Sequence, residues 1–446
     1  MWTIPTHRFR RFFPVHTFPM LWNIHGRLSF AKSISHEYRG HGYCTPRTSV
    51  FQLDERSMKA VLLSVILLLA AAAAPAPDPT SELQQRLNTG TAKLEFEKDH
   101  GYLVSLLKQL KVPVSSQTLV FSKTSLQSER ISPKTPRAIY FNDDVYVAWV
   151  QSSPLIEIMS VDPVKGSVFY MLSQERSERP AFERSTGHDC SVCHYVAEAA
   201  PKFVPRLMFS SVIPDLTGNV EGTFPIEIND QTPMKERWGG WYVTGTHGNQ
   251  THAGNVVLNR PASIMAPIAA AELAKSSNVV DLRSRFNTAP YLSPHSDIVA
   301  LMVLSHQVTV QNLIALANSK GTAAAKDTGE SLVRAMLFAG VPPLTAPIKG
   351  TSNFAAEFAG IGPRDGRGRS LRDFDLQSRL FRYPLSYLIY SKPFDAMDAS
   401  VKAVVYRRLR EVLSGDDKSR DFAYLSAADR AAILEILRAT KSDFPR

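Results

Sequence analysis

Cysteine is scarce in this chain of 446 residues, which has three: Cys44, Cys190 and Cys193. So few thiols exclude a disulfide framework of the kind that stabilises small secreted domains. They also exclude a structural zinc site made of two cysteine pairs, because no second pair is present to complete four ligands. The closely spaced pair, Cys190 and Cys193, therefore needs another chemical explanation.

Clustered charge and internal repeats are also lacking. The formal net charge is +10, but residues 1–57 supply eight Arg and Lys against three acidic residues, which is half of the excess. The rest of the chain has no Lys/Arg run with interleaved aromatic residues, so we expect no nucleic-acid partner. With 44% apolar residues, the chain can bury a sizeable core in two or three domains.

A secretory signal peptide is predicted at residues 58–76. Met58 and Lys59 begin it, an apolar run follows from Val61 to Leu69, and small residues lead to Ala74. The run is shorter than the roughly 20 residues that span a bilayer, so we expect cleavage and no stable membrane span afterwards. Because a signal peptide lies at the N-terminus, translation is inferred to start at Met58, and residues 1–57 are interpreted as a mis-assigned upstream extension. An N-terminal arm followed by a membrane anchor is the alternative.

The segment 77–136 is predicted to be helical, 137–295 β-rich and 296–446 helical. Alternating β-branched and aromatic residues favour strands, and apolar residues at 3.6-residue spacing favour helices. One or two helices are expected within 80–110, and the last helix is expected to begin at the N-cap Ser426. Strands are expected at 139–141, 145–150, 155–161 and 167–172, extended chain at 222–243, and helices at 297–318, 329–338, 374–390, 399–413 and 426–440.

The segment Cys190-Ser191-Val192-Cys193-His194 contains C-x-x-C-H, the signature of c-type haem attachment. Two thiols at this spacing can form thioethers with the two vinyl groups of one porphyrin. The imidazole of the next residue can then ligate the iron. The motif predicts one haem per chain, attached to Cys190 and Cys193, with His194 as the proximal metal ligand.

Other uses of C-x-x-C fit the sequence less well. A thioredoxin-like pair is typical of a βαβ unit, whereas the preceding residues predict a β-meander. Structural zinc would find only His188 and His194 nearby. A zinc deaminase would have a His-x-Glu upstream and a proline directly before the first cysteine, and neither is present.

The sequence leaves several candidates for the sixth iron ligand. His247 and His252 share a glycine-rich loop in which the backbone can approach a flat cofactor, and His252 is the first candidate. His306 is the rival, but it falls on the apolar face of a predicted helix, where hydrogen bonding is the common fate of a histidine. Methionine is another usual ligand. The methionines considered are Met208, Met234 and Met302.

Four segments carry a resemblance to known proteins: 136–147, 190–194, 236–248 and 382–391. Together they resemble an uncharacterised family of exported bacterial proteins described as containing a cytochrome c domain. The likeness extends over most of residues 80–446 and leaves 1–57 unmatched. It implies haem binding and electron transfer, with Cys190 and Cys193 as attachment residues and His194 as the proximal ligand.

The motif lies in mid-chain after predicted strands, so a minimal all-α cytochrome c is not expected. The predicted class is α+β, with a β-rich region around the haem, a helical C-terminal half and the haem in a crevice between them. The expected function is a periplasmic or otherwise extracytoplasmic electron carrier, served by the c-type maturation machinery and by a redox partner protein. The alternatives are a peroxidase-type haem enzyme with a distal histidine and a thiol-disulfide oxidoreductase.

Overall fold

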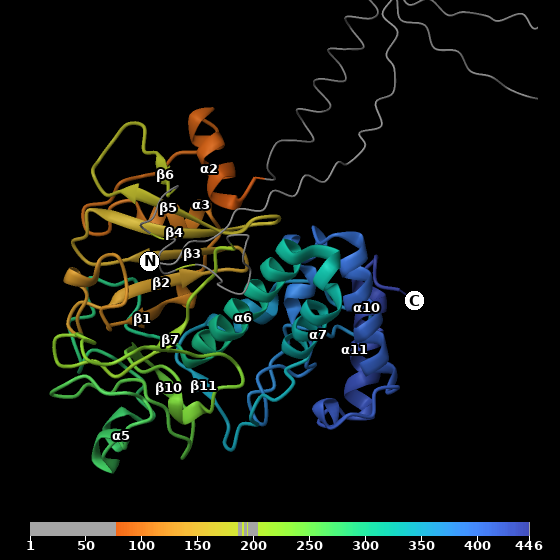
Figure 1. Cartoon of the computed structure of the whole chain (residues 1–446). Helices are drawn as coiled ribbons and strands as arrows, with labels where there is room; N and C mark the ends of the chain where they lie inside the picture. The colour runs from red at the N-terminus through yellow and green to blue at the C-terminus, as the bar shows by residue number, and fades with distance from the viewer. Residues whose placement is uncertain (1–76, 186–189, 191–193, 195–203, 446) are drawn as a thin grey trace, which may run out of the picture. The chain divides into compact units, whose positions relative to one another are not determined.

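A seven-stranded antiparallel sheet forms the β-rich part of the protein (Figure 1). The computed structural model describes residues 77–185, 190, 194 and 204–445. The predicted upstream extension and signal peptide, and Cys193, lie outside these residues. The strand order is β6-β5-β4-β3-β2-β1-β9. The bounds are β1 Thr118–Val120, β2 Arg137–Phe141, β3 Val145–Trp149, β4 Leu155–Asp162, β5 Gly166–Ser173, β6 Phe182–Arg184 and β9 Trp241–Tyr242.

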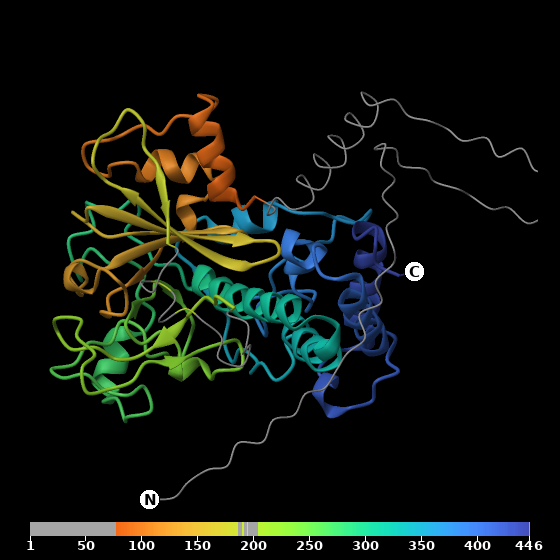
Figure 2. The same ribbon diagram turned by 45° about the horizontal axis from the view of Figure 1, so that its top comes forward.

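The sheet is covered on both faces because its strands alternate between two apolar sets. Tyr140 and Ile158 belong to the core that packs with helices α2 (Pro79–Asn88) and α3 (Leu103–Gln109). Phe141 and Met159 belong to the larger core, which includes helix α6 (Ile298–Lys320). Figure 2 shows α2 and α3 above the sheet and α6 below it. The mixed α+β class is therefore confirmed.

Helix α6 is the central helix of the larger core. The stretch Ile298–Met336 is long and apolar enough to cross a membrane, but 83% of its most apolar window is buried inside the protein. Asp297 caps the helix by accepting hydrogen bonds from the N–H groups of Val299 and Ala300. This burial is what a core helix requires, and no other described helix has that length and apolarity.

The remaining helices lie mostly in the C-terminal half, as predicted. Ser426 is the N-cap of α11 and forms a capping box with Asp429, as its position in the sequence indicated. Residues 75–446 form one compact unit, and the predicted boundaries at 136 and 295 fall within it. The helices are α5 Ala270–Ser276, α7 Ala325–Met336, α8 Phe354–Gly360, α9 Lys392–Asp395, α10 Ala399–Ser414 and α11 Ala427–Thr440.

The prediction of a helix over 374–390 is wrong. The carboxylate of Asp375 accepts hydrogen bonds from the N–H groups of Gln377, Ser378 and Arg379, which stabilises a turn instead. Phe374 and Phe381 stack at 5.3 Å, so the apolar residues meet across a loop. Only the last four residues of the segment form a 3-10 turn.

The extended segment at 222–243 contains only short strands. Strand β8 (Ile226–Glu227) pairs with β7 (Ser210–Ser211), and β9 joins the edge of the large sheet. A further small pair, β10 (Gly245–Thr246) and β11 (Lys349–Gly350), lies beside Asp297. These short pairs connect the sheet to the loops that precede α6.

Candidate haem site

The described part of the motif consists of Cys190 and His194, which are one helical turn apart. The N–H of His194 donates a hydrogen bond to the carbonyl oxygen of Cys190 at 3.0 Å. This contact spans four residues, the spacing of an α-helical bond. The first attachment residue and the proposed proximal ligand are therefore joined by a backbone hydrogen bond of helical spacing.

One nitrogen of the His194 ring has a fixed role. Its Nδ1 lies 2.9 Å from the carbonyl oxygen of Arg206. Because a carbonyl can only accept, Nδ1 carries the proton, and Nε2 of the neutral ring keeps its lone pair. Histidines that bind metals usually donate their other N–H to a carbonyl or carboxylate in this way. Burial lowers the pKa of His194, which also favours the neutral ring that a metal requires.

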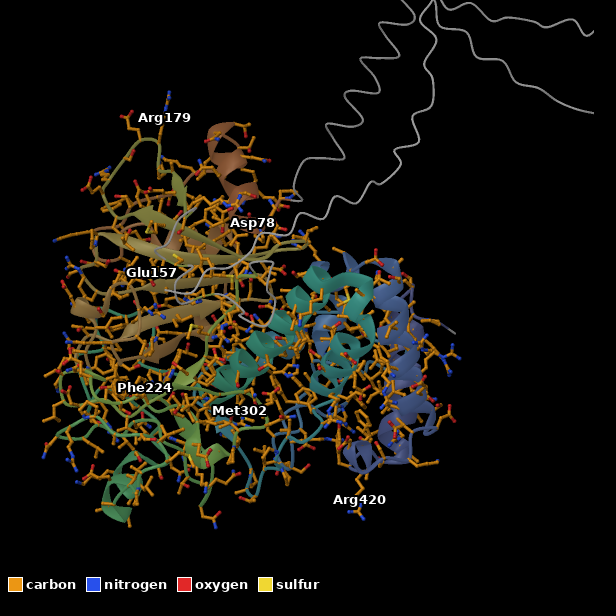
Figure 3. All side chains as sticks on the ribbon, in the orientation of Figure 1. Asp78, Glu157, Arg179, Phe224, Met302 and Arg420 are labelled. Carbon is orange, nitrogen blue, oxygen red and sulfur yellow. The ribbon has the colours of Figure 1, made fainter. Side chains whose placement is uncertain are left out.

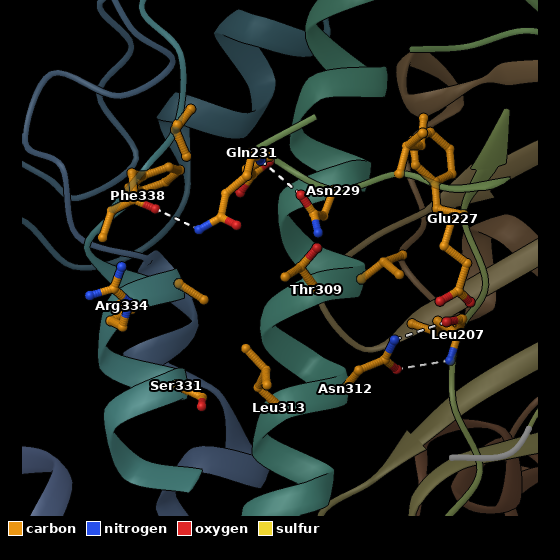
Figure 4. Close-up of a pocket in the computed structure, with 17 residues that line it drawn as sticks. Leu207, Glu227, Asn229, Gln231, Thr309, Asn312, Leu313, Ser331, Arg334 and Phe338 are labelled. Atoms are coloured by element: carbon orange, nitrogen blue, oxygen red, sulfur yellow. Dashed lines mark hydrogen bonds between the residues drawn. The ribbon is translucent and has the colours of Figure 1, made fainter. Parts of the chain in front are cut away.

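The Arg206 carbonyl is held in place by the segment around it. The N–H of Arg206 donates back to the carbonyl of His194 at 3.2 Å. The guanidinium of Arg206 pairs with Glu227 at 2.9 Å. Asn312 of α6 then exchanges two hydrogen bonds, each 2.9 Å, with the backbone of Leu207 (Figure 4). Helix α6 thus fixes the acceptor that orients His194.

His194 lies over the sheet face that points toward α6. Its ring centroid is 4.8 Å from that of Phe169 on β5. Met159 is the cross-strand partner of Phe169, and Met171 is the partner of Glu157 on β4. Glu157 is labelled in Figure 3. Glu157 forms an ion pair with Arg137 at 2.8 Å. The surroundings of His194 therefore combine apolar side chains with two ion pairs, Arg137–Glu157 and Arg206–Glu227.

A cavity of about 400 Å³ lies next to the segment that carries Arg206. It lies between residues 207–231 and helices α6 and α7 (Figure 4). Leu207, Phe209 and Glu227 line it from one side, and Leu313 and Phe338 from the other. None of its lining residues belongs to the seven-stranded sheet, so the predicted haem crevice between sheet and helices stays a prediction.

The structure brings His247 and His252 together but not near His194. Their ring centroids are 4.8 Å apart, and His252 also contacts Trp238, which directly precedes β9. His194 contacts β5, five strand steps from β9, or roughly 24 Å at about 4.8 Å per strand. This arrangement gives no support to His252 or His247 as the sixth ligand, since both axial ligands must reach one iron.

His306 is a hydrogen-bonded core histidine. Its Nδ1 lies 2.5 Å from the carboxylate of Asp230, and its Nε2 lies 2.8 Å from the hydroxyl of Ser386. The ring stacks on Phe338 at 4.2 Å. With both nitrogens bonded, His306 has no lone pair to offer a metal without losing a buried contact.

The three methionines considered as ligands are dispersed. Met208 is 38% exposed, whereas Met302 is 5% exposed. Met234 and Met302 line a second cavity, which shares Asp230, Phe338 and Val341 with the one beside Arg206. Residues that sequence reasoning missed are Phe169, Met171 and the Arg206 carbonyl, all of which the fold brings to His194 or to the sheet face beneath it. Of these, only the strand pattern around Phe169 and Met171 gave a signal in the sequence.

No cluster of three or more His, Cys, Asp or Glu side chains that could hold a metal ion is found in the part of the chain that the structure describes. An iron held by a porphyrin needs no such cluster, since the porphyrin supplies four nitrogen ligands.

Comparisons with protein-family models, with curated proteins and with solved structures found no match. The residues around His194 fit a c-type haem in donor type and in tautomer.

The buried His252 is expected to make stability depend on pH. Burial, with a smaller effect of His247, lowers its pKa from 6.5 to about 3. Between these values the unfolded chain binds a proton that the folded chain does not, so stability falls as the pH decreases from 6.5 to 3. The His252→Gln variant should lose up to about 1.4 kcal/mol per pH unit of this dependence. Urea unfolding across that range measures it, and equal slopes for both proteins would contradict it.

Proposed function

We propose that this chain is an exported monohaem c-type cytochrome that transfers electrons to or from a partner protein. Cys190 and Cys193 are the attachment residues, and His194 is the proximal ligand. The observation that carries the proposal is the hydrogen bond from His194 Nδ1 to the Arg206 carbonyl, which leaves Nε2 available to iron within a C-x-x-C-H motif. Bound haem supplies reversible one-electron chemistry at its iron.

The chain's own residues set the conditions for that chemistry. The Arg206 carbonyl accepts a hydrogen bond from the Nδ1–H of His194, which makes Nε2 a more basic ligand. Phe169 and Met159 keep water from the sheet face under His194, and burial of this kind shifts a reduction potential. The ion pair of Arg137 and Glu157 places two opposite charges nearby, and they act on the His194 pKa in opposite directions.

Export from Met58 is part of the proposal. The leader places the mature chain in the compartment where c-type cytochromes are assembled, and the maturation machinery is then a required partner. Expression of the Met58 form in a host with that machinery is the appropriate preparation. The purified mature protein is expected to begin between residues 70 and 77, as N-terminal sequencing would show.

A reversible redox spectrum tests the proposed function. The mature protein should change its visible spectrum on addition of a reductant and return on addition of an oxidant, with one electron per chain. A protein that takes up no electrons, or that shows only the titration of a dithiol, would contradict the proposal and favour a thiol oxidoreductase.

The His194→Met variant tests the ligand itself. A thioether is a weaker donor to oxidised iron than imidazole, so the variant should keep covalent haem and show a higher reduction potential. The matched control is His252→Gln, which lies at the other edge of the sheet and should leave the potential unchanged. A potential that is the same in His194→Met and in the unmodified protein would show that His194 is not a ligand.

A further inference from the structure

A second cavity of about 610 Å³ lies between the loop at 230–238 and the segments at 338–345 and 378–384. It shares Asp230, Phe338 and Val341 with the first cavity, and His194 is not among its lining residues. Its volume falls in the range of sites for small organic molecules, about 300–1,000 Å³. The walls are mainly apolar, and Met302 of α6, visible in Figure 3, contributes to them. Apolar members of the wall include Trp238, Phe338, Val341, Leu344 and Phe381.

Arg237 supplies a buried positive charge to this wall. Arg237 is only 7% exposed. Its Nε donates to the carbonyl of Thr232 at 2.7 Å, and Nη2 donates to the carbonyl of Asp230. Within the described residues, no carboxylate forms an ion pair with Arg237, and none accepts a hydrogen bond from Nη1. The guanidinium is thus held by two neutral acceptors.

Asp230 is the acidic residue whose charge acts on Arg237, and its carboxylate is already hydrogen-bonded to His306. The Asp230 carboxylate contacts His306 Nδ1 at 2.5 Å. Its charge acts on Arg237 only through space, and burial lowers the pKa of the guanidinium. A buried cation with no bonded anion is costly, because neutral carbonyls replace only part of its hydration. The cavity is open to a compensating negative group.

Trp238 is the next residue and part of the same wall. It is fully buried and its indole N–H is covered by protein, so it contributes apolar packing and no donor to the cavity. Arg237 is therefore the donor that these two residues offer. One cationic donor within apolar walls matches a carboxylate carried by an apolar body.

We propose that this cavity binds an apolar monocarboxylate, with its carboxylate at Arg237 and its body against Met302, Phe338 and Leu344. The carboxylate accepts a hydrogen bond from Arg237 Nη1. The proposal does not rest on haem binding, because neither His194 nor its contacts Phe169 and Arg206 line this cavity. Bound water at Arg237 is the competing occupant.

Calorimetric titration of the mature protein with decanoate and with decan-1-ol tests the site. Decanoate should bind with one molecule per chain and at least about tenfold more tightly than the alcohol, because only the acid compensates Arg237. Tryptophan fluorescence should change with the same midpoint. Equal affinity for the acid and the alcohol, or no heat of binding at millimolar decanoate, would overturn the proposal and leave water as the occupant.

Two variants locate the binding. Arg237→Gln should remove the preference for the acid over the alcohol. Leu344→Trp should fill the cavity and abolish binding, and it keeps the test valid if Arg237→Gln does not fold. The matched control is Leu313→Trp, which lines the other cavity and should bind decanoate as the unmodified protein does. Decanoate binding that persists in folded Leu344→Trp would place the ligand elsewhere and contradict the proposal.

Discussion

The variant in which Cys190 and Cys193 are both replaced by alanine is expected to contain no covalently bound haem. A thioether needs a sulfur at the chain, and these two are the only thiols that remain in the form beginning at Met58. After denaturing electrophoresis, a haem stain should mark the unmodified protein and leave the double variant unstained. This is a loss of the whole signal, not a graded effect.

The single variants and a distant cysteine provide the controls. Cys190→Ala or Cys193→Ala alone leaves one sulfur, so some haem should stay attached through one thioether. Cys44→Ala, made in the full-length gene, should stain as the unmodified protein does, because Cys44 lies upstream of Met58. A stained band from the double variant would contradict the assignment.

The Asp297→Ala variant is expected to lose at least about 3 kcal/mol of folding free energy. The carboxylate is 1% exposed. One oxygen caps α6, and the other accepts hydrogen bonds from the N–H groups of Thr351 and Ser352 at 2.7 Å each and from the Ser352 hydroxyl at 2.9 Å. Removal leaves several buried donors without an acceptor, each costing about 1–3 kcal/mol.

Urea unfolding followed by circular dichroism measures this loss. The matched control is Asp398→Ala, which removes the exposed cap of α10, where the side chain accepts from Ser400 N at 2.8 Å. That variant should lose much less free energy of unfolding than Asp297→Ala, because water can hydrate the N–H groups that an exposed N-cap leaves free. Equal losses in the two variants would show that the contacts of Asp297 with residues 351 and 352 do not link β11 to α6 as described.

Much of the fold could be predicted because many of its strands and helices follow residue patterns within their own segments. Strands β2 to β5 follow alternating β-branched and aromatic residues, and each pairs with its neighbour in the chain. Helices α6, α10 and α11 follow apolar spacing and caps. The prediction of a helix over 374–390 failed because it followed the apolar pattern, whereas Asp375 and Pro384 favour turns.

Long-range pairing could not be predicted. Strand β1 has three residues, and its Leu119 pairs with Tyr242 of β9 far along the chain. No periodicity in either segment indicates the other. That pairing puts β9 at the edge opposite β5, and so it separates His252 from His194. The glycines near His252 gave a reason for close backbone approach but no information on where the loop lies.

One part of the candidate site could be predicted from a local motif, and another part depends on long-range contacts. The C-x-x-C-H motif is local and can be recognised from five residues. The acceptor of His194 is a backbone carbonyl, that of Arg206, which any residue type would supply, so no sequence pattern can indicate it. Its position depends on the contact of Leu207 with Asn312, which joins segments about 100 residues apart.

The mass of the intact mature chain, measured under denaturing conditions after assembly in a competent host, tests the central claim most directly. The account predicts a single species heavier than the polypeptide by one haem, with neither Cys190 nor Cys193 open to alkylation. A colourless chain of unshifted mass, in which both sulfurs react with the alkylating reagent, would contradict it.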